Sequence, residues 1–178
     1  MAQKRSVGVV LYVEENGIRY AVLTRRGPGT KPDGSPESWI GLHQVSAHGG
    51  LEGLETWQDA RLREMEEELG MPFIQHGNWD FKFELINKVE GAEKEVQTYK
   101  LRVSLAALAC ISLEWPTIGI RLVGPEQTKN IKTIKEVGAQ KDVPITGPEV
   151  VMFADEAEAV RKVVNATTYL EEHSDELV

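Results

Sequence analysis

Three carboxylates, those of Glu64, Glu67 and Glu68, stand at helical spacing in the stretch "ARLREMEEELGM". At about 100° per residue they fall on one side of a helix, whereas Glu66 points well away from them. Like charges at these spacings repel by a few tenths of a kcal/mol per pair. A hard divalent cation, Mg²⁺ or Mn²⁺, would relieve that repulsion because it prefers carboxylate oxygens. The alternative is a solvated helix face laced with ion pairs.

The flanking residues predict the helix that would carry these carboxylates. Thr56 and Asp59 have the spacing of a capping box, and Gly70 is suited to end a helix. We therefore expect a helix from about Trp57 to Leu69. An apolar stripe on another side of it would pack on a sheet, and its members are Leu62, Met65 and Leu69.

The residues upstream of the helix decide between the two interpretations. The chain from Gly49 to Met71 reads "GGLEGLETWQDARLREMEEELGM". It resembles the signature of the Nudix hydrolase family, G-x5-E-x7-R-E-U-x-E-E-x-G-U with U an aliphatic-type residue. All nine specified positions match, and the odds of a chance match are on the order of one in ten million from average residue usage. Residues 49–71 are called the box below.

The resemblance implies an α/β/α sandwich with a mixed β-sheet. It also implies cleavage of a phosphoanhydride bond in a nucleoside diphosphate linked to another group, with Mg²⁺ or Mn²⁺ as cofactor. The substrate would be a small molecule of the dNTP, nucleotide sugar, ADP-ribose or dinucleotide type. Cations are needed because water must attack a group that already carries several negative charges. The alternative is a binding module that senses a nucleotide without cleaving it, and the resemblance also makes a homodimer an expectation.

The resemblance assigns roles to residues of the box. Glu67 and Glu68 become the principal metal ligands, and Glu64 a further ligand or the base that orients water. His48, directly before the box, would offer its backbone carbonyl to the metal, although the family commonly has Pro-Gly where this chain has Ala47-His48. Four further residues are structural, with Glu55 and Arg63 pairing to tie the loop to the helix: Gly49, Glu55, Arg63 and Gly70.

Further site residues are expected outside the box. The general base of the family varies in position, and among Glu90, Glu93, Glu95 and Glu126 we favour Glu126, which follows a strand and a turn. Arg25 and Arg26 end a strand and would contact phosphates, or form a solvated strand end. Trp39 would stack on a base, or pack in the core.

Strands and turns surround the box. "VGVVLYV" and "RYAVLTR" flank an Asn-Gly turn and predict a β-hairpin, and residues 27–38 predict a long loop. This loop and residues 90–95 are expected to set specificity. A short strand is expected within residues 39–50, and further strands at 81–89, 98–113, 118–123 and 130–137. A helix is expected over residues 155–172. Strands on both sides of a central helix indicate a mixed sheet covered by helices on its faces.

Composition limits the remaining possibilities. The length of 178 residues predicts one domain, residues 1–178, with residues 171–178 as a flexible acidic tail. The 20 basic and 28 acidic residues give a net charge of −8, which disfavours long nucleic acids as partners. Neither a signal peptide nor a membrane span is predicted, and Cys110 lacks a partner for an internal disulfide. We therefore expect a cytoplasmic protein.

Overall fold

The predicted hairpin forms the centre of the sheet in the computed structural model, which describes residues 3–30, 34–77, 82–113 and 116–166. Strands β1 (Lys4–Glu15) and β2 (Ile18–Arg26) pair in antiparallel fashion. At the turn Asn16 and Gly17 have φ values of 52° and 75°. Such left-handed residues match the twist of a two-residue hairpin loop, so the Asn-Gly signal is confirmed.

The sheet has seven strands and mixed directions. Strand β6 (Lys94–Arg102) runs parallel to β1 and antiparallel to β5 (Glu84–Glu90). Strand β7 (Thr117–Val123) runs antiparallel to β2. A separate short parallel pair is formed by β8 (Lys132–Thr133) and β9 (Val151–Met152).

Two short strands, where the sequence predicted one, lead into the box. Strand β3 (His43–Val45) pairs with β2, and β4 (Ala47–Gly50) pairs with β1. Between them the fully buried Ser46 accepts a hydrogen bond from the Leu11 N–H (2.8 Å) and donates one to the Val22 carbonyl oxygen (2.6 Å). At Ser46 the chain thus changes from pairing with β2 to pairing with β1. One hydroxyl satisfies a backbone group of each of these two strands.

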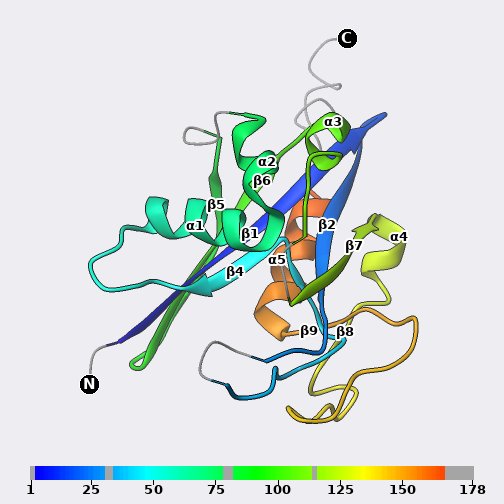
Figure 1. Ribbon diagram of the computed structural model, residues 1–178. Helices are drawn as coiled ribbons and strands as arrows, with labels where there is room; N and C mark the ends of the chain where they lie inside the picture. The colour runs from blue at the N-terminus through cyan, green and yellow to red at the C-terminus, as the bar shows by residue number, and fades with distance from the viewer. Residues whose placement is uncertain (1–2, 31–33, 78–81, 114–115, 167–178) are drawn as a thin grey trace.

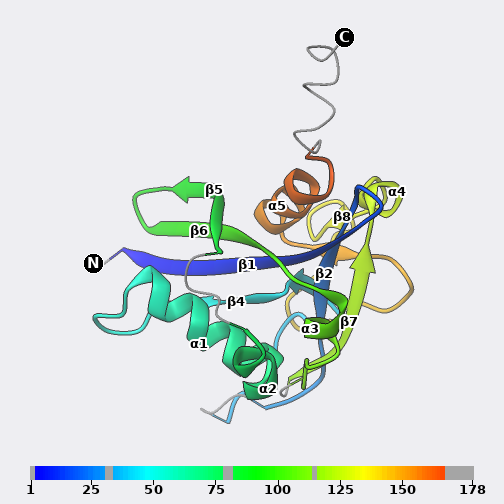
Figure 2. The ribbon, with the colours of Figure 1, turned by 90° about the horizontal axis from the view of Figure 1, so that it is seen from above.

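Helices cover both faces of the sheet. Helix α1 (Trp57–Leu69) and helix α5 (Ala154–Val164) lie on opposite sides of β1 in Figure 2. The core on the α1 side includes Val9, Leu11, Val22, Met65, Leu69 and Phe73, and that on the α5 side Val10, Leu23, Val45, Met152, Val160 and Val163. The predicted α/β/α sandwich is confirmed (Figure 1).

The boundaries of α1 agree with the prediction. Thr56 is the N-cap, its hydroxyl accepts from the Asp59 N–H, and the Asp59 carboxylate accepts from the Thr56 N–H. Gly70 ends the helix with φ 84°, and a Cβ there would lie 2.5 Å from the Ser112 carbonyl oxygen. Any other residue at position 70 would be strained and would also clash.

Other predicted elements differ from the structure. The strand predicted over residues 98–113 ends at Arg102 and is followed by α3 (Leu105–Leu108), because Ser104 caps a run of helix-forming Leu and Ala. The strand predicted over 130–137 shrinks to β8. Helices α2 (Met71–Gln75) and α4 (Pro125–Thr128) were not predicted.

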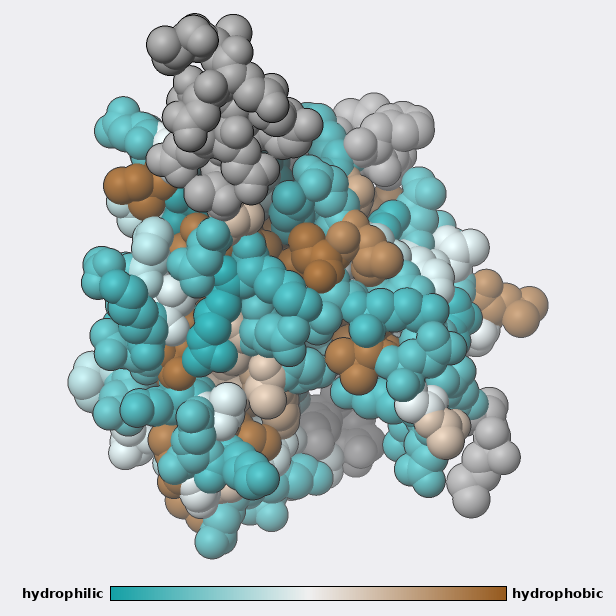
Figure 3. Space-filling view, turned by 180° about the vertical axis from the view of Figure 1, so that it is seen from behind, coloured by the Kyte–Doolittle hydropathy of each residue, from teal (hydrophilic) through white to brown (hydrophobic). Residues whose placement is uncertain are grey.

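The C-terminal helix begins within one residue of its predicted start, and the part of the prediction beyond residue 166, with the tail, lies outside the described residues. None of the described helices is both long and apolar enough to cross a membrane. Seen from behind, the surface is largely hydrophilic, with apolar residues in small separate groups (Figure 3).

Candidate active site

The carboxylate of Glu64 is packed against the backbone of Gly49. A Cβ at position 49 would lie 1.9 Å from Glu64 Oε1 and 2.2 Å from Oε2. Glu64 is only 6% exposed, so helix α1 and strand β4 are in close contact at this point. A larger residue at position 49 would push the carboxylate out of this place.

Arg63 joins the loop after β4 to the acidic face of α1. Its Nε and Nη2 donate to the two oxygens of Glu55 (2.9 and 3.1 Å), and Nη2 also donates to the Gly50 carbonyl (2.7 Å). Its Nη1 donates to Glu64 Oε1 (2.8 Å) and to both oxygens of Glu67 (3.1 and 3.2 Å). One guanidinium therefore fixes the loop and partly compensates two of the three carboxylates.

Glu68 of α1 lies near the end of β2 and the start of β7. The Thr117 hydroxyl, at the start of β7, donates to Glu68 Oε2. The charges of Arg26, at the end of β2, and of Glu37, in the following loop, also act on Glu68. Arg26 in turn pairs with Glu37 at 3.5 Å. Glu37 and Thr117 belong to the site although no sequence motif singled them out.

Burial and mutual repulsion disfavour negative charge on this face of α1. Burial, with smaller contributions from the Glu67 and Glu68 charges, raises the pKa of Glu64 to about 7 despite the opposing effect of Arg63. Burial, with the Glu67 and Glu37 charges, likewise raises the pKa of Glu68 against the Thr117 hydrogen bond and Arg26. The cluster would accept further positive charge.

The donor set fits a hard divalent cation, because all three side chains offer carboxylate oxygens that are short of positive charge. As the side chains stand, no three His, Cys, Asp or Glu residues of the described chain lie close enough together to hold an ion. Glu67 accepts from Arg63, and Glu68 accepts from Thr117. The Glu67 side chain is 55% exposed, so it has room to turn.

Comparisons with known proteins bear on this arrangement. The model of the NUDIX domain family matches residues 2–108, more than half of the 178 residues. The chain belongs to the NUDIX domain family. The predicted resemblance is therefore confirmed, and with it the prediction of a Nudix hydrolase at the level of the family.

Solved structures of low sequence identity share the Nudix fold. DR0079 from Deinococcus radiodurans is 19% identical, with a TM-score of 0.56 over 90% of this chain and 82% of that one. A MutT/nudix family protein from Enterococcus faecalis is 12% identical, with a TM-score of 0.59 over 98% of this chain. The present chain spans 63% of the Enterococcus protein. A search of curated protein sequences gave no significant match.

His48, directly before the Nudix box, turns its imidazole towards helix α5. Its Nδ1 lies 3.8 Å from Glu156 Oε1. Burial, with the nearby charges of Lys94 and Arg26, lowers the pKa of His48 to about 4, whereas Asp155 opposes that effect. The imidazole is thus neutral at pH 7, and only the backbone carbonyl of this residue is a candidate ligand on the Nudix box.

Arg25 and Arg26 are adjacent in sequence but belong to different surroundings. A β-bulge separates them in the pairing of β2 with β7. Arg26 lies near Glu37 and Glu68, as the prediction of a phosphate contact requires. Arg25 instead lines a hollow with His43 and Arg121. Bulges commonly re-aim a side chain in this way.

Trp39 lies on the α5 side of the Nudix fold. Its ring packs edge-on against Phe153, the N-cap of α5, with the centroids 5.6 Å apart. The backbone N–H of Trp39 donates to the Lys141 carbonyl oxygen (2.9 Å). These contacts join the loop after β2 to the long connection between β8 and β9.

Glu126, the favoured general base, is not brought to the Nudix box. It lies on α4, which Figures 1 and 2 show on the far side of the molecule from α1. Its side chain is 81% exposed and pairs with Lys129 at 2.8 Å. The turn after β7 leads away from the box, a direction that the order of residues along the chain does not reveal. Glu90 and Glu93 are also exposed, at the tip of the β5–β6 hairpin.

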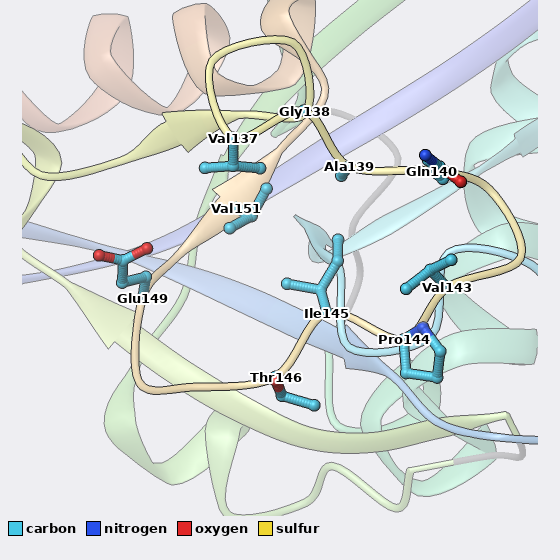
Figure 4. A pocket seen from close by; sticks show the side chains of 10 residues that line it. All are labelled: Val137, Gly138, Ala139, Gln140, Val143, Pro144, Ile145, Thr146, Glu149 and Val151. Atoms are coloured by element: carbon cyan, nitrogen blue, oxygen red, sulfur yellow. The ribbon is translucent and has the colours of Figure 1, made fainter.

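A hollow of about 340 Å³ lies within the connection between β8 and β9. Figure 4 shows its wall, in which the apolar side chains of Val137, Val143 and Ile145 are joined by the polar side chains of Gln140, Thr146 and Glu149. Residues of the Nudix box are not among those that line it.

Proposed function

We propose that the protein is a metal-dependent pyrophosphohydrolase that cleaves a phosphoanhydride bond in a nucleoside diphosphate linked to another group. The observation that carries the proposal is the complete box, in which the buried Glu64 carboxylate packs on Gly49 beside Glu67 and Glu68. A solvated helix face would not need a buried carboxylate with a pKa raised to about 7.

The three box carboxylates and the His48 carbonyl would hold Mg²⁺ or Mn²⁺. When bound, such an ion neutralises phosphate charge and lowers the pKa of the attacking water. We assign Glu67 and Glu68 to ligation, and Glu64 to ligation or to the orientation of water. Arg63 would keep the loop and the helix in register through Glu55.

The substrate would be a small nucleotide derivative such as a dNTP, a nucleotide sugar, ADP-ribose or a dinucleotide, in the cytoplasm. Arg26 supports a phosphate contact because it lies near Glu68. The loop of residues 27–38 and the β8–β9 connection would set specificity, since Trp39 and Lys141 join them beside α5.

The test is an activity screen with matched variants. The purified protein with Mg²⁺ or Mn²⁺ is assayed against dNTPs, NADH, ADP-ribose, dinucleoside polyphosphates and nucleotide sugars. We expect turnover of at least one class. Glu67→Gln and Glu68→Gln should each lower kcat by about 100-fold or more, because a charged ligand to a catalytic cation is lost.

Glu66→Gln is the matched control, since Glu66 is an exposed neighbour on the same helix. It should retain the activity of the unchanged protein. Full activity in both the Glu67 and Glu68 variants would refute the proposal. Thermal stabilisation by a nucleotide without turnover of any panel member would instead support a non-catalytic sensing module.

A further inference from the structure

Three nitrogen-bearing side chains converge where β2, β3 and β7 lie side by side. In the sheet Arg25 is paired with His43 of β3 on one side and with Gly119 of β7 on the other. Arg121 is two residues further along β7, so it points to the same face as Gly119. These residues, with Ile118 and Ile120, line a hollow of about 270 Å³. We call it the basic hollow.

The basic hollow lacks negative charge. Its lining includes no Asp or Glu. In the described part of the chain, neither Arg25 nor Arg121 has a carboxylate within ion-pair distance, whereas Arg19, Arg26, Arg63 and Arg102 all do. Arg121 Nη1 donates to the Pro148 carbonyl oxygen (2.7 Å), which carries no charge. Two guanidinium groups without a paired carboxylate are unexpected in a protein with a net charge of −8.

Polar atoms in the wall of the basic hollow are also unsatisfied. Arg25 Nε and His43 Nδ1 are buried and have no hydrogen-bond partner among the described residues. Burial, with the charges of Arg25 and Arg121, lowers the pKa of His43 to about 4. At pH 7 the imidazole is therefore a neutral hydrogen-bonding group near two cations. Buried polar groups without partners are costly unless something else satisfies them.

The hollow has room for a ligand. Its volume of about 270 Å³ is several times the roughly 30 Å³ that one water occupies in the liquid. A Cβ at Gly119 would meet nothing within 4 Å, so the floor beside Arg25 is open. Guanidinium groups pair with tetrahedral oxyanions through charge-assisted hydrogen bonds.

We propose that the basic hollow formed by Arg25, His43 and Arg121 binds a phosphate group. The two guanidinium groups supply the charge, the imidazole supplies a hydrogen bond, and the open surface at Gly119 supplies the space. The phosphate is either free inorganic phosphate or a phosphate of a nucleotide. Only the nucleotide case rests on the proposed function, because binding of free phosphate requires no catalysis.

The probe is inorganic phosphate, added to the metal-free protein in EDTA at constant ionic strength maintained with KCl. The imidazole C–H resonances of His43 report binding by NMR. We expect a saturable shift with the unchanged protein. Arg25→Gln and Arg121→Gln should each weaken binding on the order of tenfold or more, because a charge-assisted hydrogen bond to the phosphate is lost.

Arg102→Gln is the matched control, because Arg102 is exposed and pairs with Glu14 at 3.4 Å on another part of the sheet. It should bind phosphate as the unchanged protein does. Arg121 is exposed, so its variant should fold even if the Arg25 variant does not. Equal binding by the Arg121 and Arg102 variants, or the absence of a saturable shift in the unchanged protein, would overturn the proposal.

A second titration with ADP, again in EDTA, distinguishes the sources of the phosphate group. If saturating ADP prevents the shift that phosphate causes, the basic hollow holds a nucleotide phosphate. If phosphate binds equally well with ADP present, the hollow is a separate site for free phosphate. Neither outcome depends on hydrolysis, so failure of the proposed function and failure of this proposal are separable.

Discussion

The acidic face of α1 and the basic hollow lie near the same end of β2 but are built in different ways. Glu64, Glu67 and Glu68 come from one helix, and Arg63 from that helix compensates two of them. Arg25, His43 and Arg121 come from three strands. The bulge after Arg25 separates the two, because it leaves Arg26 near Glu68 and Arg25 in the hollow.

The difference shows how each cluster responds to change. The acidic cluster is fixed by spacing within a helix and by one close contact with Gly49, so it should be sensitive to atoms added there. The basic hollow depends on the register of three strands and has open space at Gly119. Three substitutions test this contrast, two of them in the box, at Gly49 and Glu64, and one outside it, at Glu126.

Gly49→Ala should have the largest effect. The added Cβ would lie 1.9 Å from Glu64 Oε1, so the carboxylate must move. A displacement of about 1 Å at a catalytic group costs on the order of 100-fold in rate, and we expect such a loss in kcat/KM. Gly50→Ala is the control, because its nearest neighbour is the Arg5 carbonyl oxygen at 3.8 Å. Equal activity of the two variants would show that close packing does not constrain the acidic cluster.

Glu64→Gln should change how stability depends on pH. Burial raises the pKa of Glu64 from 4.5 to about 7 in the folded protein. The folded state therefore binds the proton more tightly than the unfolded state, and this contribution to stability is lost as pH rises through about 7. In EDTA the Tm of the unchanged protein should fall relative to that of the variant by several degrees between pH 4.5 and pH 7 or just above.

Glu156, whose pKa is also raised by burial, to about 8, contributes a slope of the same sign. It is present in both proteins and cancels in the comparison. Saturating Mg²⁺ should favour ionised Glu64 and reduce the difference in Tm. Parallel curves for the two proteins in EDTA would show that Glu64 titrates normally.

Glu126→Gln should have the smallest effect. The side chain is 81% exposed and lies on α4, so substitution should alter stability by no more than about 0.5 kcal/mol. We also expect kcat to stay within about twofold of the unchanged protein, because α4 lies away from the box and the substitution should change the activation free energy little. A large loss of kcat would mean that α4 reaches the box during turnover and that the acidic cluster extends beyond α1.

The helix and the grouping of its carboxylates could be predicted because their determinants are local. The Thr56–Asp59 capping box and Gly70 bound α1, and the spacing of Glu64, Glu67 and Glu68 places them on one face. The hairpin was equally readable from Asn16 and Gly17. In each case the residues that specify the element lie within it or directly beside it in the sequence.

Features that depend on tertiary contacts could not be predicted. The role of Ser46 needs β1 and β2 on both sides of it. Thr117 donates to Glu68, and the charge of Glu37 acts on it, from distant parts of the chain. The direction of α4, which removed Glu126 from the site, follows from packing against α5 and β7. The position of a single Glu in sequence carries no such information.

The stretch from His43 to Gly50 limits where related chains can gain or lose residues. Ser46 fixes this stretch to both β1 and β2 through its two hydrogen bonds. One end supplies His43 to the basic hollow, and the other supplies Gly49 to the Glu64 carboxylate. Adding or removing one residue would turn one end to the wrong face of the sheet. Related chains should therefore vary in length within the β8–β9 connection while keeping the spacing between positions 43 and 49.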